Sequence, residues 1–268
     1  MPYHDAHLHS DHSFDGEAAV LDYADAAAAM GLSGITVTDH LDLGAPGLGD
    51  VAFDGPGCLR DVMRARAAHP GIRVLYGVEA GLTAEDLGRT EAAVSGGGYD
   101  YVVASVHYIR GGDLYYPDYY DGRTKAEATE GYLAATIECL GAFDDYDCLG
   151  HLGYLSRYWP YPDKAFGDGD GDLAGMVDAV LRALAEGGKG LEVNTAGIAV
   201  GGKASPLPGY GIVARFLELG GENVTLGSDA HRAGDLGRGF GPAAEALRGL
   251  GLRYLAYYEN RKPVHYRV

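Results

Sequence analysis

The sequence predicts an α/β fold with a mainly parallel sheet, built as one domain of the barrel type. Short β-rich segments alternate with longer segments rich in alanine and leucine, which is the pattern of repeated strand–helix–strand units. Seven such units can be counted, and no low-complexity linker interrupts them. A length of 268 residues is usual for an α/β barrel, so we expect residues 1–268 to form a single domain.

The expected elements follow one another regularly along the chain. The first strand is expected at 3–9, and the first helix at 17–31, where Gly31 is a typical residue to end a helix. Further strands are expected at 33–40, 72–80, 99–108, 146–153, 190–197 and 223–231. Helices are expected between them, near 57–68, 84–95, 124–142, 172–187, 207–219 and 241–249. Two last extended segments, RYLAYYEN and KPVHYRV, are expected to form an appendage.

Composition argues against several classes of partner. The 38 acidic residues outnumber the 21 basic ones, and a formal net charge of −17 disfavours nucleic acid and anionic membranes. The first ten residues lack the features of a signal peptide, and no apolar run reaches membrane-spanning length. The three cysteines show no paired spacing, which is typical of reduced thiols. We therefore expect a soluble cytoplasmic protein, while the sequence indicates no oligomeric state.

Side chains that can bind metal gather at the carboxyl ends of the expected strands. Six of the ten histidines lie there with two acids and an amide: His7, His9, His40, Glu79, His107, His151, Asn194, Asp229 and His231. In a barrel these ends share one face, where the loops form the active site. A single histidine in such a place is more often structural than catalytic. Unrelated histidines would, however, scatter over helices and loops, so the joint pattern predicts a metal site.

Four histidines stand outside this pattern. His4 lies earlier in the first strand, His69 precedes a proline in a turn, and His265 lies in the last extended segment. His12 and Asp15 both lie in the loop that follows the first strand and are alternative metal ligands from that loop.

Seven segments together resemble the PHP family, named for polymerase and histidinol phosphatase, and in particular its histidinol-phosphate phosphatases. They are DAHLHSDHSFDG, ITVTDH, YGVEA, DYVVASVHY, LGHLGYLSRY, EVNTAG and LGSDAHR, and they run from residue 5 to residue 232. The resemblance implies a distorted (β/α)7 TIM-like barrel with three divalent metal ions. Residues 1–268 are thus expected to form a single PHP-type metallophosphoesterase domain.

The resemblance also implies three sets of metal ligands, of which the first two share Glu79 as a bridge. The sets are His7, His9, Glu79 and Asp229; Glu79, His107 and His151; and Asp15, His40 and His231. Relatives often carry histidine where this chain has Asp15, so His12 remains an alternative for the third set. Mixed imidazole and carboxylate ligands suit zinc, manganese or iron and do not distinguish among them.

The implied activity is hydrolysis of a phosphate monoester, L-histidinol phosphate, in histidine biosynthesis. A hydroxide between two metals is expected to attack phosphorus, and Asp229 or His231 is expected to handle the proton. The positive metals would also allow an acidic protein to bind a dianionic phosphate. Arg157 is expected to stabilise charge on the phosphoryl oxygens. The residues expected to contact substrate are Arg157, Tyr158, Lys203 and Arg232.

Two positions depart from the family pattern and keep other substrates open. Gly153 stands where relatives often carry aspartate, and Ala199 where they tend to carry an arginine that grips phosphate. A phosphoesterase for another small phosphate, such as a nucleotide, is one alternative; a polymerase-associated, nuclease-like module is another, which the acidic charge disfavours. The tyrosine-rich segment 113–122 is expected either to contact substrate as a lid or to pack without a substrate role.

Overall fold

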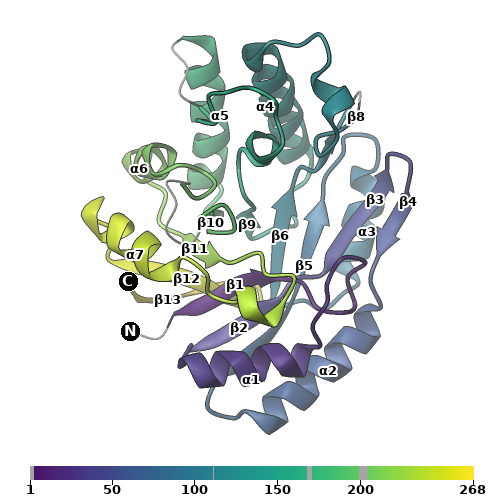
Figure 1. Cartoon of the computed structure of the whole chain (residues 1–268), viewed down its shortest axis with the longest axis vertical. Coiled ribbons are helices and arrows are strands. Elements are labelled where there is room, and N and C mark those ends of the chain that lie inside the picture. Colours follow the sequence, from purple (N-terminus) through teal and green to yellow (C-terminus); the bar gives the residue numbers. More distant parts are fainter. Residues whose placement is uncertain (1–2, 111, 168–170, 199–204) are drawn as a thin grey trace.

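The computed structural model describes residues 3–110, 112–167, 171–198 and 205–268. Seven parallel strands pair in the order β1-β2-β5-β6-β9-β10-β11 and curve into a nearly closed barrel (Figure 1). They are β1 (His4–Leu8), β2 (Gly34–Val37), β5 (Arg73–Gly81), β6 (Tyr101–Ser105), β9 (Cys148–Leu149), β10 (Gly190–Asn194) and β11 (Val224–Gly227). Because the strands are parallel and run in chain order, the predicted α/β barrel is confirmed.

Helices connect these strands and lie around the barrel (Figure 1). They are α1 (Val20–Met30), α2 (Gly55–Ala68), α3 (Leu87–Ser95), α4 (Lys125–Ala142), α5 (Asp172–Glu186), α6 (Tyr210–Glu218) and α7 (Phe240–Gly249). As predicted, α1 ends at Gly31, whose φ of +70° suits a residue without a Cβ. At the start of α4, Thr124 and Glu127 form a reciprocal capping box that satisfies free backbone N–H groups.

The barrel closes where β1 meets the segment after β11. Leu8 forms an isolated parallel bridge with Ala230. Asp5 is fully buried, and its two carboxylate oxygens accept hydrogen bonds from the backbone N–H groups of Ser228 and Gly237, each at 2.9 Å. Backbone hydrogen bonds from His9 N–H to the Ala230 carbonyl at 2.9 Å and from Asp229 N–H to the His7 carbonyl at 2.8 Å complete the closure.

The sequence did not predict the hairpin formed by β3 (His40–Ala45) and β4 (Gly49–Ala52). The expected strand 33–40 breaks after Val37, and the chain resumes as β3, which pairs in parallel with β5. Gly47 and Gly49 both have φ of +76°, which permits the tight turn between β3 and β4.

Other expected strands are also shorter than predicted, among them 190–197, which ends at Asn194, and 223–231, which spans Val224–Gly227. Only two residues of the expected strand 146–153 form β9. The expected strand 99–108 ends at Ser105 and is followed by the short pair β7 (Tyr108–Ile109) and β8 (Gly112–Asp113). The polar residues after each shortened strand consequently lie in loops rather than in the sheet.

The expected appendage is an antiparallel hairpin, β12 (Tyr254–Glu259) and β13 (Lys262–Arg267). It covers the amino-terminal ends of the barrel strands. The ring of Tyr257 stacks on His4 of β1 with centroids 4.4 Å apart, and Tyr258 stacks on Tyr101 of β6 at 5.0 Å. This end of the barrel is thus closed, and the carboxyl ends form the accessible face.

Apolar side chains of the helices pack on the outside of the barrel. The ring of Tyr23 in α1 and the side chain of Val62 in α2 pack with Ile35 of β2, and α4 to α7 supply the larger core around β9 and β10. No helix in the described ranges is long and apolar enough to cross a membrane.

Candidate metal centre

The carboxyl ends of the strands bring together all nine residues predicted to bind metal. Glu79, near the end of β5, lies at their centre and is 1% exposed. Its Oε2 atom lies 3.4 Å from Nε2 of His7, which is in β1, and 3.4 Å from Nε2 of His9, which directly follows β1. Its Oε1 atom lies 2.7 Å from Nε2 of His151 and 3.2 Å from Nε2 of His107. Oε2 also lies 3.1 Å from Nδ1 of His40. One carboxylate therefore faces five imidazoles, which is the geometry of a bridging ligand.

Asp229 completes the first predicted set. Its Oδ1 atom lies 3.2 Å from Nε2 of His9 and 3.8 Å from Nε2 of His7. The ligand atoms of these three residues lie within 4.8 Å of one another. Asp229 follows β11 with a φ of +54°, which directs its backbone back toward β1. The three residues could share one ion with Glu79.

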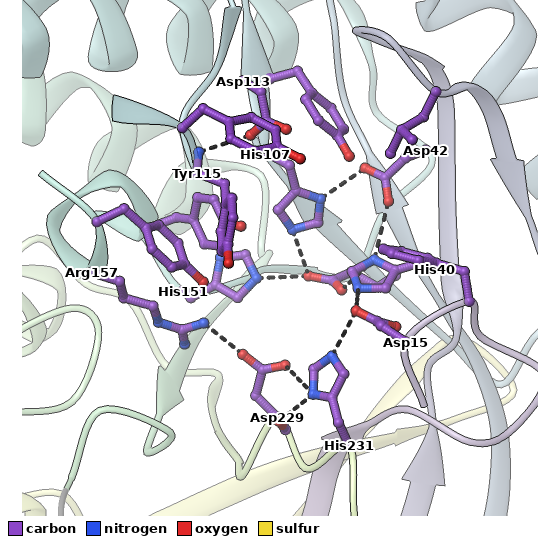
Figure 2. A pocket seen from close by; sticks show the side chains of 17 residues that line it. Asp15, His40, Asp42, His107, Asp113, Tyr115, His151, Arg157, Asp229 and His231 are labelled. Carbon is purple, nitrogen blue, oxygen red and sulfur yellow. Dashed lines mark hydrogen bonds and ion pairs between the residues drawn. The ribbon is translucent and has the colours of Figure 1, made fainter. Parts of the chain in front are cut away.

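The third predicted set also comes together, at the rim of the cavity (Figure 2). Oδ2 of Asp15 lies 3.0 Å from Nε2 of His231 and 3.5 Å from Nε2 of His40. His12 instead faces Asp61 of α2 at 3.0 Å. Asp15 therefore lies beside His40 and His231, whereas His12, the alternative for this set, does not.

The electrostatics of the group fit a cation. Burial opposes ionisation of Glu79, but the facing His7, His107 and His40 hold its pKa well below its usual value. Burial lowers the pKa of His9 to about 3, and His40 beside it acts in the same direction. Despite burial, the facing acids raise the pKa of His107 to about 9 and that of His7 and His40 well above the usual value, so these rings hold protons between the carboxylates. A metal ion binds the charged carboxylate and the neutral imidazole, and it would take the place of those protons.

The hydrogen bonding of Glu79 and Asp15 also fits the presence of a cation. Oε2 of Glu79 and Oδ1 of Asp15 are buried and have no hydrogen-bond donor among the described residues. An unpaired buried carboxylate oxygen is costly unless a cation is present. The donor set of imidazoles and carboxylates therefore fits divalent metal ions.

Two buried carboxylates that the sequence reasoning missed hold the imidazoles in place. Oδ1 of Asp42 lies 2.8 Å from Nδ1 of His107, and Oε1 of Glu192 lies 2.7 Å from Nδ1 of His7. Such partners fix the ring orientation of a metal-binding histidine. The signals were present: Asp42 follows His40 by two residues, and Glu192 is an acid within the apolar strand GLEVN.

A cavity of about 320 Å³ opens over these residues (Figure 2). Arg157, predicted to contact substrate, ends the short helix η2 (Tyr154–Arg157) and lines this cavity with Tyr158. Its Nη1 donates to Oδ2 of Asp229 at 2.9 Å, and its Nη2 donates to Oδ1 of Asn194 at 2.6 Å. Arg157 is thus held beside the predicted ligands, with its side chain 19% exposed.

The segment 113–122 divides between its two expected roles. Asp113, Tyr115 and Tyr116 line the cavity, opposite the ring of Tyr158, which lies 4.8 Å from that of Tyr115. The rings of Tyr119 and Tyr120, by contrast, are buried and pack in the core.

The two residues predicted to handle the proton both lie within the ligand group. The side chain of Asp229 is 7% exposed, and that of His231 is 33% exposed. Their side chains approach to 3.9 Å between Oδ1 and Nδ1. Either residue would therefore have to transfer a proton in addition to serving as a metal ligand.

One other predicted substrate contact is not brought to the cavity. Arg232 does not line it; its side chain is 67% exposed and pairs with Glu17 at 2.6 Å. Lys203 and Ala199 lie outside the described residues. Gly153 has a φ of +95°, and a Cβ there would lie 2.6 Å from the ring of Phe166. An aspartate at this position would require a rare backbone conformation and a shift of that ring.

Comparisons with known proteins agree with this geometry. The "Histidinol-phosphatase" of Lactococcus lactis subsp. lactis is 32% identical, over 85% of this chain and 84% of its own. The "Probable histidinol-phosphatase" of Clostridium acetobutylicum is 30% identical, over 96% of this chain and 97% of its own. A crystal structure of histidinol phosphate phosphatase from Lactococcus lactis subsp. lactis, complexed with zinc, L-histidinol and phosphate, superposes with a TM-score of 0.88. It is 29% identical, and the match covers 98% of each chain.

The profile of the PHP domain matches residues 5–196. This span includes seven of the nine predicted ligands, and the other two, Asp229 and His231, lie beyond it but face the same centre. The matched length and the full-length relatives lead to one conclusion: this chain belongs to the PHP domain family.

Proposed function

We propose that this chain is a metal-dependent phosphomonoesterase that hydrolyses L-histidinol phosphate to L-histidinol and phosphate, a step of histidine biosynthesis. The observation that carries the proposal is Glu79, whose carboxylate lies within 3.4 Å of five imidazoles at the base of a cavity. The full-length relatives bear histidinol-phosphatase names, which supports the substrate. Residues 1–268 would act as a single domain of this type.

The ligands proposed for three divalent ions form three sets. They are His7, His9, Glu79 and Asp229; Glu79, His107 and His151; and Asp15, His40 and His231. When bound, such ions would lower the pKa of a water molecule and offset the negative charge of the phosphate. Zinc is favoured by the relative crystallised with it, while manganese and iron suit the same donors.

The residues of the chain itself would bind and orient the phosphate. Arg157 presents its guanidinium beside Asp229, and the pKa of Arg157 is raised because the attraction of Asp229 outweighs burial. The group is therefore permanently charged and suited to hold two phosphoryl oxygens as charge develops on them. Asn194 fixes the guanidinium from its other side.

The far side of the cavity fits the rest of the substrate. Asp113 supplies a carboxylate for an ammonium group, and Tyr115, Tyr116 and Tyr158 supply aromatic faces for an imidazole. Leaving-group binding of this kind orients the phosphate for attack.

The test is hydrolysis of L-histidinol phosphate before and after thorough chelation. Activity should disappear and return when zinc, manganese or iron is added back, and elemental analysis of the restored protein should give three equivalents. Nucleoside monophosphates and other small phosphates serve as competing substrates, compared by kcat/KM.

Two results would contradict separate parts of the proposal. Activity that survives in metal-free protein would refute the metal-dependent mechanism. A nucleotide hydrolysed with a higher kcat/KM than L-histidinol phosphate would leave the mechanism in place and refute the substrate.

A further inference from the structure

Asp42 is a buried carboxylate that belongs to none of the three proposed ligand sets. It is 2% exposed, and its two oxygens face two different imidazoles (Figure 2). Oδ1 lies 2.8 Å from Nδ1 of His107, and Oδ2 lies 3.1 Å from Nδ1 of His40. One side chain thus contacts two proposed ligands, one in β3 and one in the loop after β6.

The pairing of β3 with β5 creates this arrangement. His40 lies opposite Glu79, and Asp42 lies opposite Gly81, so both residues of β3 project from the same face of the sheet. A Cβ on residue 81 would overlap the carboxylate of Asp42. Glycine at this position leaves the space that Asp42 occupies.

The contacts of Asp42 have a direct meaning for metal binding. An imidazole that binds metal through Nε2 donates its Nδ1–H to an acceptor, which fixes the tautomer and the ring plane. Nε2 of His107 faces Glu79 at 3.2 Å, and Nε2 of His40 faces Asp15 at 3.5 Å. In His107 the nitrogen that faces Asp42 is the one that the metal would not use. Nδ1 of His40 lies 3.1 Å from Asp42 and also 3.1 Å from Oε2 of Glu79, while its Nε2 is the nitrogen that faces Asp15.

We propose that Asp42 is a positioning residue that couples the second and third metal sites. The inference rests on the ligand sets of the proposed function, in which His107 serves the second site and His40 the third. Those two sets share no ligand, and Asp42 contacts one member of each; Glu79 of the second set also lies 3.1 Å from Nδ1 of His40. Loss of this carboxylate should weaken both sites together rather than one of them.

Glu192 offers a matched comparison at the other side of Glu79. It is also buried, but it accepts from only one imidazole, Nδ1 of His7 at 2.7 Å. Its second oxygen accepts the backbone N–H of His151 at 2.6 Å, which leaves that ring unaffected. Its removal should therefore weaken a single site.

The experiment compares Asp42→Asn and Glu192→Gln with the wild type, using zinc alone as the probe. Competition with a chromophoric chelator gives the number of sites and the affinity of each. Asp42→Asn should lower the affinity of two of the three equivalents about 10- to 100-fold, which is the usual cost of losing such a partner. Glu192→Gln should lower the affinity of one.

A second measurement distinguishes a change in the orientation of the histidine rings from a non-specific change in packing. In zinc-loaded protein labelled with ¹⁵N-histidine, hydrogen-bonded Nδ1–H groups give distinct resonances. Asp42→Asn should shift two of them, and Glu192→Gln should shift one. A change limited to packing would shift none of them selectively.

The outcomes distinguish the inference from the function on which it rests. A wild type with fewer than three zinc sites would refute the proposed ligand sets. A wild type with three sites, combined with an Asp42→Asn protein that loses one or none, would overturn the coupling alone. Should Asp42→Asn fail to fold, Gly81→Ala displaces the same carboxylate from β5; unchanged affinities at both sites in that protein would overturn the inference equally.

Discussion

The two ends of the barrel bury the same kinds of side chain and arrange them in opposite ways. At the carboxyl end, Glu79 faces imidazoles, and one of its oxygens has no donor among the described residues. At the amino end, Asp147 pairs with the guanidinium of Arg261 at 2.6 Å. His4 there contacts Thr36 at 2.8 Å and stacks on an aromatic ring. Burial of a histidine or a carboxylate therefore does not by itself indicate a metal site. A metal site is indicated where several imidazoles face carboxylate oxygens that have no hydrogen-bond donor.

The largest expected effect comes from exchanging a buried carboxylate at each end. Glu79→Gln removes the charge that faces five imidazoles, so kcat/KM for L-histidinol phosphate should fall roughly a thousandfold or more, equivalent to about 4 kcal/mol. The control Asp147→Asn, at the hairpin end, should keep its metal content and stay within a few-fold of wild-type activity. Equal losses in the two proteins would remove the distinction between the ends.

Next in size is an apolar truncation at the closed end. Leu255 of β12 is fully buried, so Leu255→Ala should lower the free energy of unfolding by about 3 kcal/mol through lost contacts and a cavity. Urea unfolding measures this change. Zinc stoichiometry of the folded variant should remain that of the wild type, and a loss of zinc would show that the two ends are not independent.

The two predicted substrate-binding arginines give a smaller and sharper contrast. Arg157 lines the cavity and Arg232 does not. Arg157→Ala should lower kcat/KM about a hundredfold, which is typical of losing one donor to developing charge. Arg232→Ala removes only an exposed pair with Glu17 and should change kcat/KM less than twofold. Steady-state assays at a fixed zinc concentration measure both values of kcat/KM. An unchanged kcat/KM in Arg157→Ala would exclude the proposed phosphate contact.

The smallest expected effect concerns His4 and pH. Burial lowers the pKa of His4 to about 3, with Arg73 adding to the effect, against 6.5 for the unconstrained side chain. The unfolded chain thus binds a proton more readily, and stability is lost as the pH falls below 6.5. Between pH 8 and pH 5 the wild type should lose about 2 kcal/mol more than His4→Gln. Urea unfolding at the two pH values measures the difference, and equal losses would contradict a neutral buried His4.

The sequence predicted the order of strands and helices well because their signals are local. Alternation of apolar strands with alanine-rich helices, and Gly31 after α1, depend on neighbours within a few residues. The placement of eight of the nine expected ligands followed from one further rule, that parallel strands end on the same face, whereas Asp15 was expected from the family resemblance.

What the sequence could not supply depends on contacts between distant segments. The hairpin β3–β4 was missed because LDLGAPGLGDVA carries more turn residues than strand residues, and its pairing with β5 stabilises it. The roles of Asp42 and Glu192 require knowledge of which strand lies beside which. His12 and Asp15 lie three residues apart, and only the turn of the loop decides which of them reaches His231.

The closure of the barrel between β1 and the segment after β11 also sets when the centre can exist during synthesis. Asp15 leaves the ribosome early, whereas its partner His231 follows 216 residues later. A nascent chain that has not passed residue 231 lacks at least one ligand of the third set and cannot close the ring of strands. Contacts of such long sequence separation form late and slowly. Of the three proposed sets, only Glu79, His107 and His151 would be complete in a product that ends before Asp229, so full metal loading would require the finished barrel.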